Sequence, residues 1–175
     1  MRGFAAIGLD NPKCLANIGG AMRAVACYGG ALIVLGGPRV IRLGKLVTDT
    51  TKAYRRIPVL QVDDVMQAIP FDCVPVAVDL VEGARDLRTY THPERAYYIF
   101  GAEDATLGKR VLDHCRDKVM IPMNGCMNLA ASVNVVLYDR LMKSSKASNV
   151  RVHRRALRYV CSSSLVRARP SATRC

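Results

Sequence analysis

Three short stretches of this sequence carry polar residues or glycines where a loop meets a regular element, and each could take part in chemistry. The first holds Asn17, Gly19, Gly20 and Arg23 at the start of a predicted helix. Asn17 can cap that helix, and the glycines allow another backbone or a ribose to approach closely. Spacing alone favours an ordinary capped helix with one surface arginine.

The second and third stretches each follow a predicted strand. Gly101 ends a strand and is followed by Glu103 and Asp104, at the sheet edge where open α/β folds bind ligands. A simple turn, whose acids favour the next helix N-terminus, is the alternative. Residues 119–129 form a strand, an uncharged loop and a helix start. Such a loop suits an adenine ring, although it can equally be a buried connection.

Other kinds of site lack their usual signatures. The sequence has no G-x-G-x-x-G after a strand, no Walker lysine loop and no G-x-S-x-G elbow, which disfavours dinucleotide oxidoreductases, P-loop NTPases and typical hydrolases. The seven cysteines form no Cys-x-x-Cys pair, and His92, His114 and His153 follow no metal-ligand spacing. We therefore expect reduced thiols and no metal.

The elements that must position these stretches alternate between short apolar runs and longer helical ones. Strands are predicted at 3–9, 31–35, 58–62, 74–80, 97–100 and 119–122, and helices at 15–28, 63–68, 107–115 and 128–143. This alternation predicts an α/β fold with a mainly parallel sheet flanked by helices. The length of 175 residues suits one domain with a single core.

The positive charge is concentrated near the C-terminus. The net charge is +12, and residues 140–175 hold ten Lys or Arg and no acid, which leaves 16 basic and 14 acidic residues in 1–139. A basic extension suits a polyanion such as RNA, because each phosphate contact releases counterions; a merely solvated tail is the alternative. The apolar runs are too short for a membrane helix and the N-terminus reads as a strand, so we expect a soluble, cytoplasmic protein without membrane contact.

Taken in order, the three stretches resemble the motifs of the SpoU (TrmH-like) branch of the SPOUT RNA 2'-O-ribose methyltransferases. The resemblance covers residues 1–143. It is carried by Asn17, Gly19 and Arg23 in the first motif, by Gly101, Glu103 and Gly108 in the second, and by Ile121, Pro122, Met123, Met127, Asn128 and Leu129 in the third. Cys126 stands where the family usually has Ser, and a thiol is the weaker hydrogen-bond donor. The basic tail has no counterpart in the family.

The resemblance implies a methyltransferase domain at 1–143, with a C-terminal trefoil knot. The charge and composition of residues 144–175 predict a basic extension with weak order. It also implies a homodimer formed through the helices at 15–28 and 129–143, with the active site completed near the interface. The implied cofactor is S-adenosyl-L-methionine. Its binding residues would be Asp79, Leu80, Gly101, Ile121, Pro122, Met123, Gly125, Cys126, Asn128 and Leu129.

The implied reaction is methyl transfer to a ribose 2'-hydroxyl. Arg23 would act as a general base or, more simply, as an electrostatic stabiliser of the emerging alkoxide. Asn17 and Asn128 would orient Arg23 and the ribose, and Glu103 would anchor the substrate or a neighbouring loop. The RNA is expected to be tRNA rather than rRNA, by analogy with minimal members of the family. The expected RNA-binding residues are Lys52, Arg55, Arg56, Arg151, Arg154 and Arg155.

Two other functions remain open at this point. A non-catalytic RNA-binding homologue would keep the fold but not the reaction, and Cys126 is the only feature that favours it. A small-molecule α/β enzyme whose tail merely aids solubility would leave the three ordered motifs unexplained.

Overall fold

The structure, a computed structural model, describes residues 3–38 and 46–144. The chain separates into two units, Met1–Ser144 and Ser145–Cys175, and every described residue belongs to the first. The predicted basic extension therefore lies, except for Ser144, outside the described residues.

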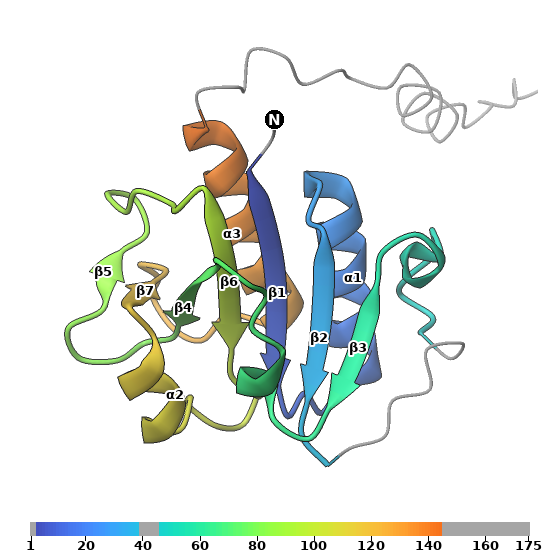
Figure 1. The fold of residues 1–175 in the computed structure, drawn as a ribbon, viewed down its shortest axis with the longest axis horizontal. Coiled ribbons are helices and arrows are strands. Elements are labelled where there is room, and N and C mark those ends of the chain that lie inside the picture. Colours follow the sequence, from blue (N-terminus) through green and yellow to red (C-terminus); the bar gives the residue numbers. More distant parts are fainter. Residues whose placement is uncertain (1–2, 39–45, 145–175) are drawn as a thin grey trace, which may run out of the picture. The chain divides into compact units, whose positions relative to one another are not determined.

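A seven-stranded sheet forms the centre of the first unit (Figure 1). Its strands are β1 (Phe4–Asp10), β2 (Leu32–Gly36), β3 (Val59–Val62), β4 (Val74–Val78), β5 (Arg85–Asp86), β6 (Arg95–Phe100) and β7 (Asp117–Met120). The spatial order is β3-β2-β1-β6-β4-β7-β5, and every neighbouring pair is parallel. The predicted α/β class with a mainly parallel sheet is confirmed.

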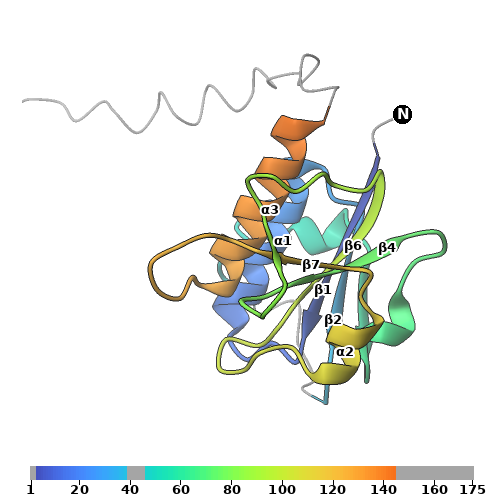
Figure 2. The same ribbon diagram turned by 90° about the vertical axis from the view of Figure 1, so that its left-hand side faces the viewer.

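Helices cover both faces of this sheet (Figure 2). On one face, α1 (Leu15–Tyr28) and α3 (Leu129–Lys143) pack against each other; a Cβ on Gly20 would lie only 2.8 Å from that of Ala130. On the other face lie α2 (Lys109–His114) and the short 3-10 helix η3 (Val65–Ala68). A second 3-10 helix, η2 (Ala53–Arg55), contacts α1.

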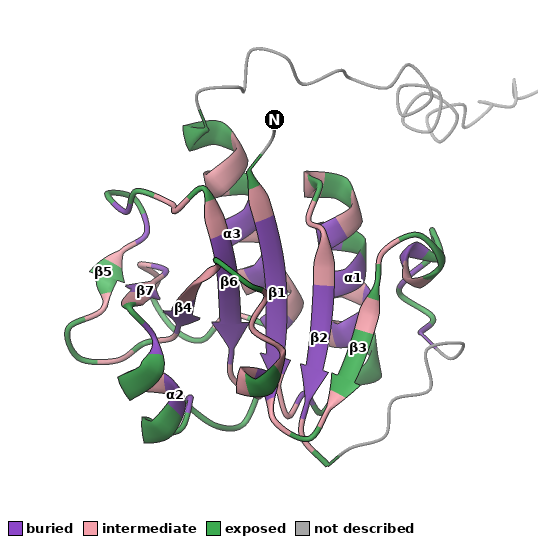
Figure 3. Cartoon of the chain, in the orientation of Figure 1, coloured by how far each residue is buried: buried purple, intermediate pink, exposed green. Residues whose placement is uncertain are grey.

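The central strands are buried on both sides (Figure 3). Alternate residues of a strand point to opposite faces, so Ile7 packs with α1 and α3 whereas Ala6 packs with η3 and α2. Tyr97 and Tyr98 of β6 are fully buried and likewise point to opposite faces. Two apolar cores therefore sandwich the sheet, as expected for parallel strands covered on both faces.

The described residues contain neither a membrane-spanning helix nor a cluster of metal ligands. Within the described residues, no helix is long and apolar enough to cross a membrane. In the same part of the chain, no group of three or more His, Cys, Asp or Glu side chains could hold a metal ion.

Candidate functional site

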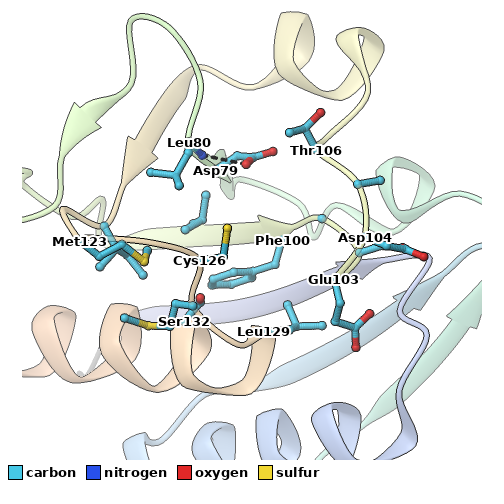
Figure 4. Close-up of a pocket in the computed structure, with 16 residues that line it drawn as sticks. Asp79, Leu80, Phe100, Glu103, Asp104, Thr106, Met123, Cys126, Leu129 and Ser132 are labelled. Carbon is cyan, nitrogen blue, oxygen red and sulfur yellow. Dashed lines mark hydrogen bonds between the residues drawn. The ribbon is translucent and has the colours of Figure 1, made fainter.

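A cavity of about 360 Å³ opens at the carboxyl ends of β4, β6 and β7 (Figure 4). Its size is in the range of small-molecule sites, and its place is where parallel α/β sheets bind ligands. Four segments supply its walls: the end of β4, the loop after β6, the loop after β7 and the first turn of α3. The lining residues are Val78, Asp79, Leu80, Phe100, Gly101, Ala102, Glu103, Asp104, Ala105, Thr106, Ile121, Met123, Cys126, Met127, Leu129 and Ser132.

Most of the residues predicted to bind a cofactor lie in this lining. These are Asp79, Leu80, Gly101, Ile121, Met123, Cys126 and Leu129. Pro122, Gly125 and Asn128 do not line the cavity; Gly125 adopts a φ of 111°, a conformation that favours glycine in the turn between them. The sequence analysis did not assign Val78, Phe100 and Ser132 to the site. Val78 and Phe100 end predicted strands, and Ser132 shares a helix face with Leu129 three residues earlier, so the sequence held signals for all three.

The cavity combines apolar walls with a polar rim. Phe100, Ile121 and Leu129 are nearly buried, with 2%, 7% and 6% of their surface exposed. Glu103 and Asp104 line its edge from the loop after β6, and their side chains point away from the apolar walls (Figure 4). Asp104 Oδ2 pairs with Lys13 Nζ at 3.1 Å. This arrangement suits a ligand that has one flat apolar part and one polar or charged part.

Asp79 fixes two walls of the cavity instead of presenting a free carboxylate. Its Oδ1 accepts a hydrogen bond from the Leu80 backbone N–H at 2.7 Å, drawn in Figure 4. Its Oδ2 accepts from the Leu107 backbone N–H, also at 2.7 Å. The carboxylate thus links the end of β4 to the end of the loop that follows β6.

Glu103 connects that same loop to the start of α1. Its Oε1 accepts hydrogen bonds from Asn17 Nδ2 at 2.7 Å and from the Cys14 backbone N–H at 3.2 Å. Its Oε2 accepts from the Lys13 backbone N–H at 3.0 Å. Partial burial raises the pKa of Glu103, but these hydrogen bonds outweigh it, so the pKa lies below its ordinary value.

Asn17 and Asn128 join the first stretch to the third. Asn128 Nδ2 donates to Asn17 Oδ1 at 2.7 Å, and Asn128 Oδ1 accepts from the backbone N–H groups of Ala130 and Ala131. Asn128 therefore caps α3. The prediction that Asn17 caps its helix is wrong: Cys14 is the N-cap residue of α1, and Asn17 lies inside the first turn, bonded to groups distant in the chain.

Arg23 is exposed on the third turn of α1. Within the described part of the chain, its side chain forms no hydrogen bond or ion pair, and it does not line the cavity. Its guanidinium is therefore available to a molecule that approaches from outside.

The basic residues predicted to bind RNA fall into two groups. Lys52, Arg55 and Arg56 are exposed, and all three belong to the segment around η2. The Arg55 guanidinium lies 5.8 Å from the centre of the Tyr54 ring. The other three, Arg151, Arg154 and Arg155, lie outside the described residues.

Solved structures of known proteins share this fold. The SpoU methyltransferase AviRb from Streptomyces viridochromogenes, in complex with the cofactor AdoMet, matches with a TM-score of 0.71 and 22% identity over 82% of this chain and 61% of its own. An AdoMet-bound rRNA methyltransferase from Sinorhizobium meliloti matches with a TM-score of 0.72 and 21% identity, over 82% of this chain and 58% of its own. This chain thus spans about three fifths of either protein.

A third structure is closer in length. It is described as giving structural insights into the 2-OH methylation of C/U34 on tRNA, and it matches with a TM-score of 0.68 and 23% identity over 81% of this chain and 91% of its own. No curated protein sequence matches the chain. The family model of the SpoU rRNA Methylase family matches residues 5–138. This confirms the resemblance of the three motifs, and the chain belongs to the SpoU rRNA Methylase family.

Proposed function

We propose that this protein is an S-adenosyl-L-methionine-dependent RNA methyltransferase that methylates a ribose 2'-hydroxyl, with tRNA as its preferred substrate. The observation that carries the proposal is the hydrogen-bonded chain from Glu103 through Asn17 to Asn128 beside the cavity. These hydrogen bonds join one residue from each of the three family motifs next to the cavity. The trefoil knot and the division at residue 143 remain predictions from the family.

The cavity fits the proposed cofactor in its chemistry. The apolar surfaces of Phe100, Ile121 and Leu129 suit an adenine ring. The hydroxyl groups of Thr106 and Ser132, which also line the cavity, suit the polar parts of the cofactor. When bound, the cofactor supplies a methyl group on a positively charged sulfur. The AdoMet complexes of the Streptomyces and Sinorhizobium proteins support this choice.

Arg23 is the proposed catalytic residue. A ribose hydroxyl is a poor nucleophile until it loses its proton, and Arg remains protonated under ordinary conditions. Its positive charge would stabilise the alkoxide as it forms while the hydroxyl proton passes to solvent water, so no proton transfer to the guanidinium is required. Asn17 and Asn128 are joined by a hydrogen bond between their side-chain amides. They would keep the N-terminal ends of α1 and α3 together and so orient Arg23 and the ribose. Glu103 would anchor the loop before α1.

We propose further that a homodimer completes the site. Arg23 does not line the cavity of its own chain, and in the proposed dimer the Arg23 of a second copy would reach it. α1 and α3 are the proposed interface, because they expose Leu15, Tyr138 and Met142, with 38%, 53% and 55% of their surface accessible. These apolar side chains would be covered in a dimer.

The choice of tRNA is supported by the extent of one match. This chain covers 91% of the protein described with tRNA methylation, but only about three fifths of the AviRb and Sinorhizobium proteins. The Sinorhizobium protein is an rRNA methyltransferase. The basic residues at 151, 154 and 155 would add phosphate contacts to those of Lys52, Arg55 and Arg56.

The test is methyl transfer from labelled S-adenosyl-L-methionine to total tRNA and total rRNA, with the modified nucleotide mapped. We expect label at a ribose 2'-oxygen in tRNA. Arg23→Ala should abolish transfer while RNA binding is retained, and Arg116→Ala, which changes an exposed arginine just before β7, should leave transfer intact. Calorimetry that detects no cofactor binding would favour the non-catalytic RNA-binding homologue instead.

A further inference from the structure

The segment that follows β2 is seated directly on α1. Thr48 Oγ1 donates a hydrogen bond to the Ala16 carbonyl oxygen at 2.6 Å. A Cβ added to Gly19 would clash with Thr48 Oγ1 and would lie 3.0 Å from the Asp49 backbone nitrogen. Gly19 therefore forms a notch in the helix surface, and this notch receives the backbone of residues 48–49.

The segment is also held together by its own hydrogen bonds. Asp49 is only 3% exposed, and its carboxylate accepts from Thr51 Oγ1 at 3.1 Å and from the Tyr54 backbone N–H at 3.3 Å. The Lys52 N–H donates to the Asp49 carbonyl oxygen at 2.9 Å. Ala53 is fully buried in the same core as α1. The backbone that carries the basic side chains thus has a defined shape.

This seat lies on the same side of α1 as Arg23. Residues three, four and seven positions apart share one face of a helix, and Ala16, Gly19 and Arg23 have this spacing. Thr48 therefore contacts α1 about one to two turns before Arg23. The side chains of Lys52, Arg55 and Arg56 remain exposed on the seated segment.

We propose that Thr48 is a positioning residue for RNA. Its hydroxyl holds the segment 46–56 in the notch at Gly19, so that Lys52, Arg55 and Arg56 form one preformed cationic surface beside the face of α1 that carries Arg23. This surface takes the phosphates that flank the target ribose. A preformed surface loses less conformational entropy when it binds than a loose loop does. The inference rests on the proposed function, because it assumes that RNA is the ligand.

The experiment compares three variants of the full chain. Thr48→Val keeps the size of the side chain but removes the hydroxyl, Thr48→Ser keeps the hydroxyl, and Thr50→Val is the matched control on an exposed threonine of the same segment. Thr48→Val should raise the KM for tRNA about fivefold, the worth of one hydrogen bond, and leave kcat unchanged. Thr48→Ser should restore the KM, and Thr50→Val should not change it.

A second measurement reports on the seat itself. Hydrogen exchange at the Lys52, Arg55 and Arg56 amides should become faster in Thr48→Val and stay unchanged in Thr50→Val. Unchanged KM and unchanged exchange in Thr48→Val would overturn the proposal, and so would a loss of kcat with the KM retained.

Failure of the proposed function can be told apart from failure of this inference. If the wild-type protein transfers no methyl group, the proposed reaction is wrong, and the same variants are compared by the anisotropy of fluorescent tRNA. Weaker binding by Thr48→Val than by Thr50→Val would still support the positioning role. Equal binding by the two variants would overturn it.

Discussion

Asn17 and Asn128 are 111 positions apart in the chain, yet their side chains share a hydrogen bond of 2.7 Å from Asn128 Nδ2 to Asn17 Oδ1. This contact joins the first turn of α1 to the N-cap of α3. Glu103 extends it on the other side, because its carboxylate accepts from Asn17 Nδ2. A change at one of these three residues therefore reaches the other two stretches of the site.

Asn128 combines a helix cap with this link, and two substitutions separate the two roles. Asn128→Ala removes both and should lower the free energy of unfolding by about 2 kcal/mol. Asn128→Ser keeps a capping oxygen but cannot reach Asn17, so it should recover about half of that loss. Urea unfolding at neutral pH measures both. Equal stability of the two variants would show that the cap contributes nothing.

Asp79 should matter for cofactor affinity through the wall that it fixes. Asp79→Ala frees the Leu80 and Leu107 N–H groups, and the loop after β6 loses its link to β4. We expect binding of S-adenosyl-L-methionine to weaken about tenfold, as measured by calorimetry. Asp113→Ala, on an exposed acid of α2, is the control and should leave the affinity unchanged. The same affinity in both variants would contradict the role of Asp79.

The proposed dimer can be tested on the exposed aromatic residue of α3. Tyr138 is 53% exposed and packs edge-on against Tyr28 at 6.2 Å between ring centres. Tyr138→Glu would bury a charge at the interface, so light scattering should find a monomer, and methyl transfer should be lost with it. Phe71→Glu, on a side chain that is 94% exposed outside α1 and α3, should remain a dimer. A monomeric wild-type protein with full activity would refute the proposal.

Elements with a strong local pattern could be predicted from the sequence. The helix expected at 15–28 has these bounds in the structure, and it ends at Gly29, whose φ of 73° favours glycine. The helix expected at 63–68 is instead the 3-10 helix η3, begun by the side chain of Asp64. β5 was not predicted, because its two residues are too few for a periodic pattern.

Site residues could be predicted from the sequence only where their position in a strand or loop places them at the site. Strand ends lie at the ligand edge of a parallel sheet, so Gly101 and Ile121 could be assigned from order alone. The partners of polar side chains could not be, since they lie far away in the chain. Asp79 bonds Leu107, 28 positions later, and Glu103 bonds Asn17, 86 positions earlier. No local pattern records these pairs.

A pH dependence follows from His92, which lies near the C-terminal end of α3. Its side chain is 5% exposed; Nδ1 lies 2.6 Å from the Tyr98 hydroxyl and Nε2 lies 2.8 Å from Asp139 Oδ2. Burial lowers the pKa of His92 and outweighs the attraction of Asp139, while the positive charges of Arg140 and Lys143 lower it further. Asp139 also pairs with Lys143 at 2.7 Å.

His92 therefore stays neutral to a lower pH in the folded protein than in the unfolded chain, which takes up a proton near the ordinary pKa of about 6.5. The free energy of unfolding should be highest above that pH and should fall as the pH is lowered through it. His92→Gln should remove this part of the decline between about pH 7.5 and 5.5. His114→Gln, on an exposed histidine of α2, should retain it. Urea unfolding across this range decides: if His92→Gln declines as steeply as the wild type, burial does not control the protonation of His92.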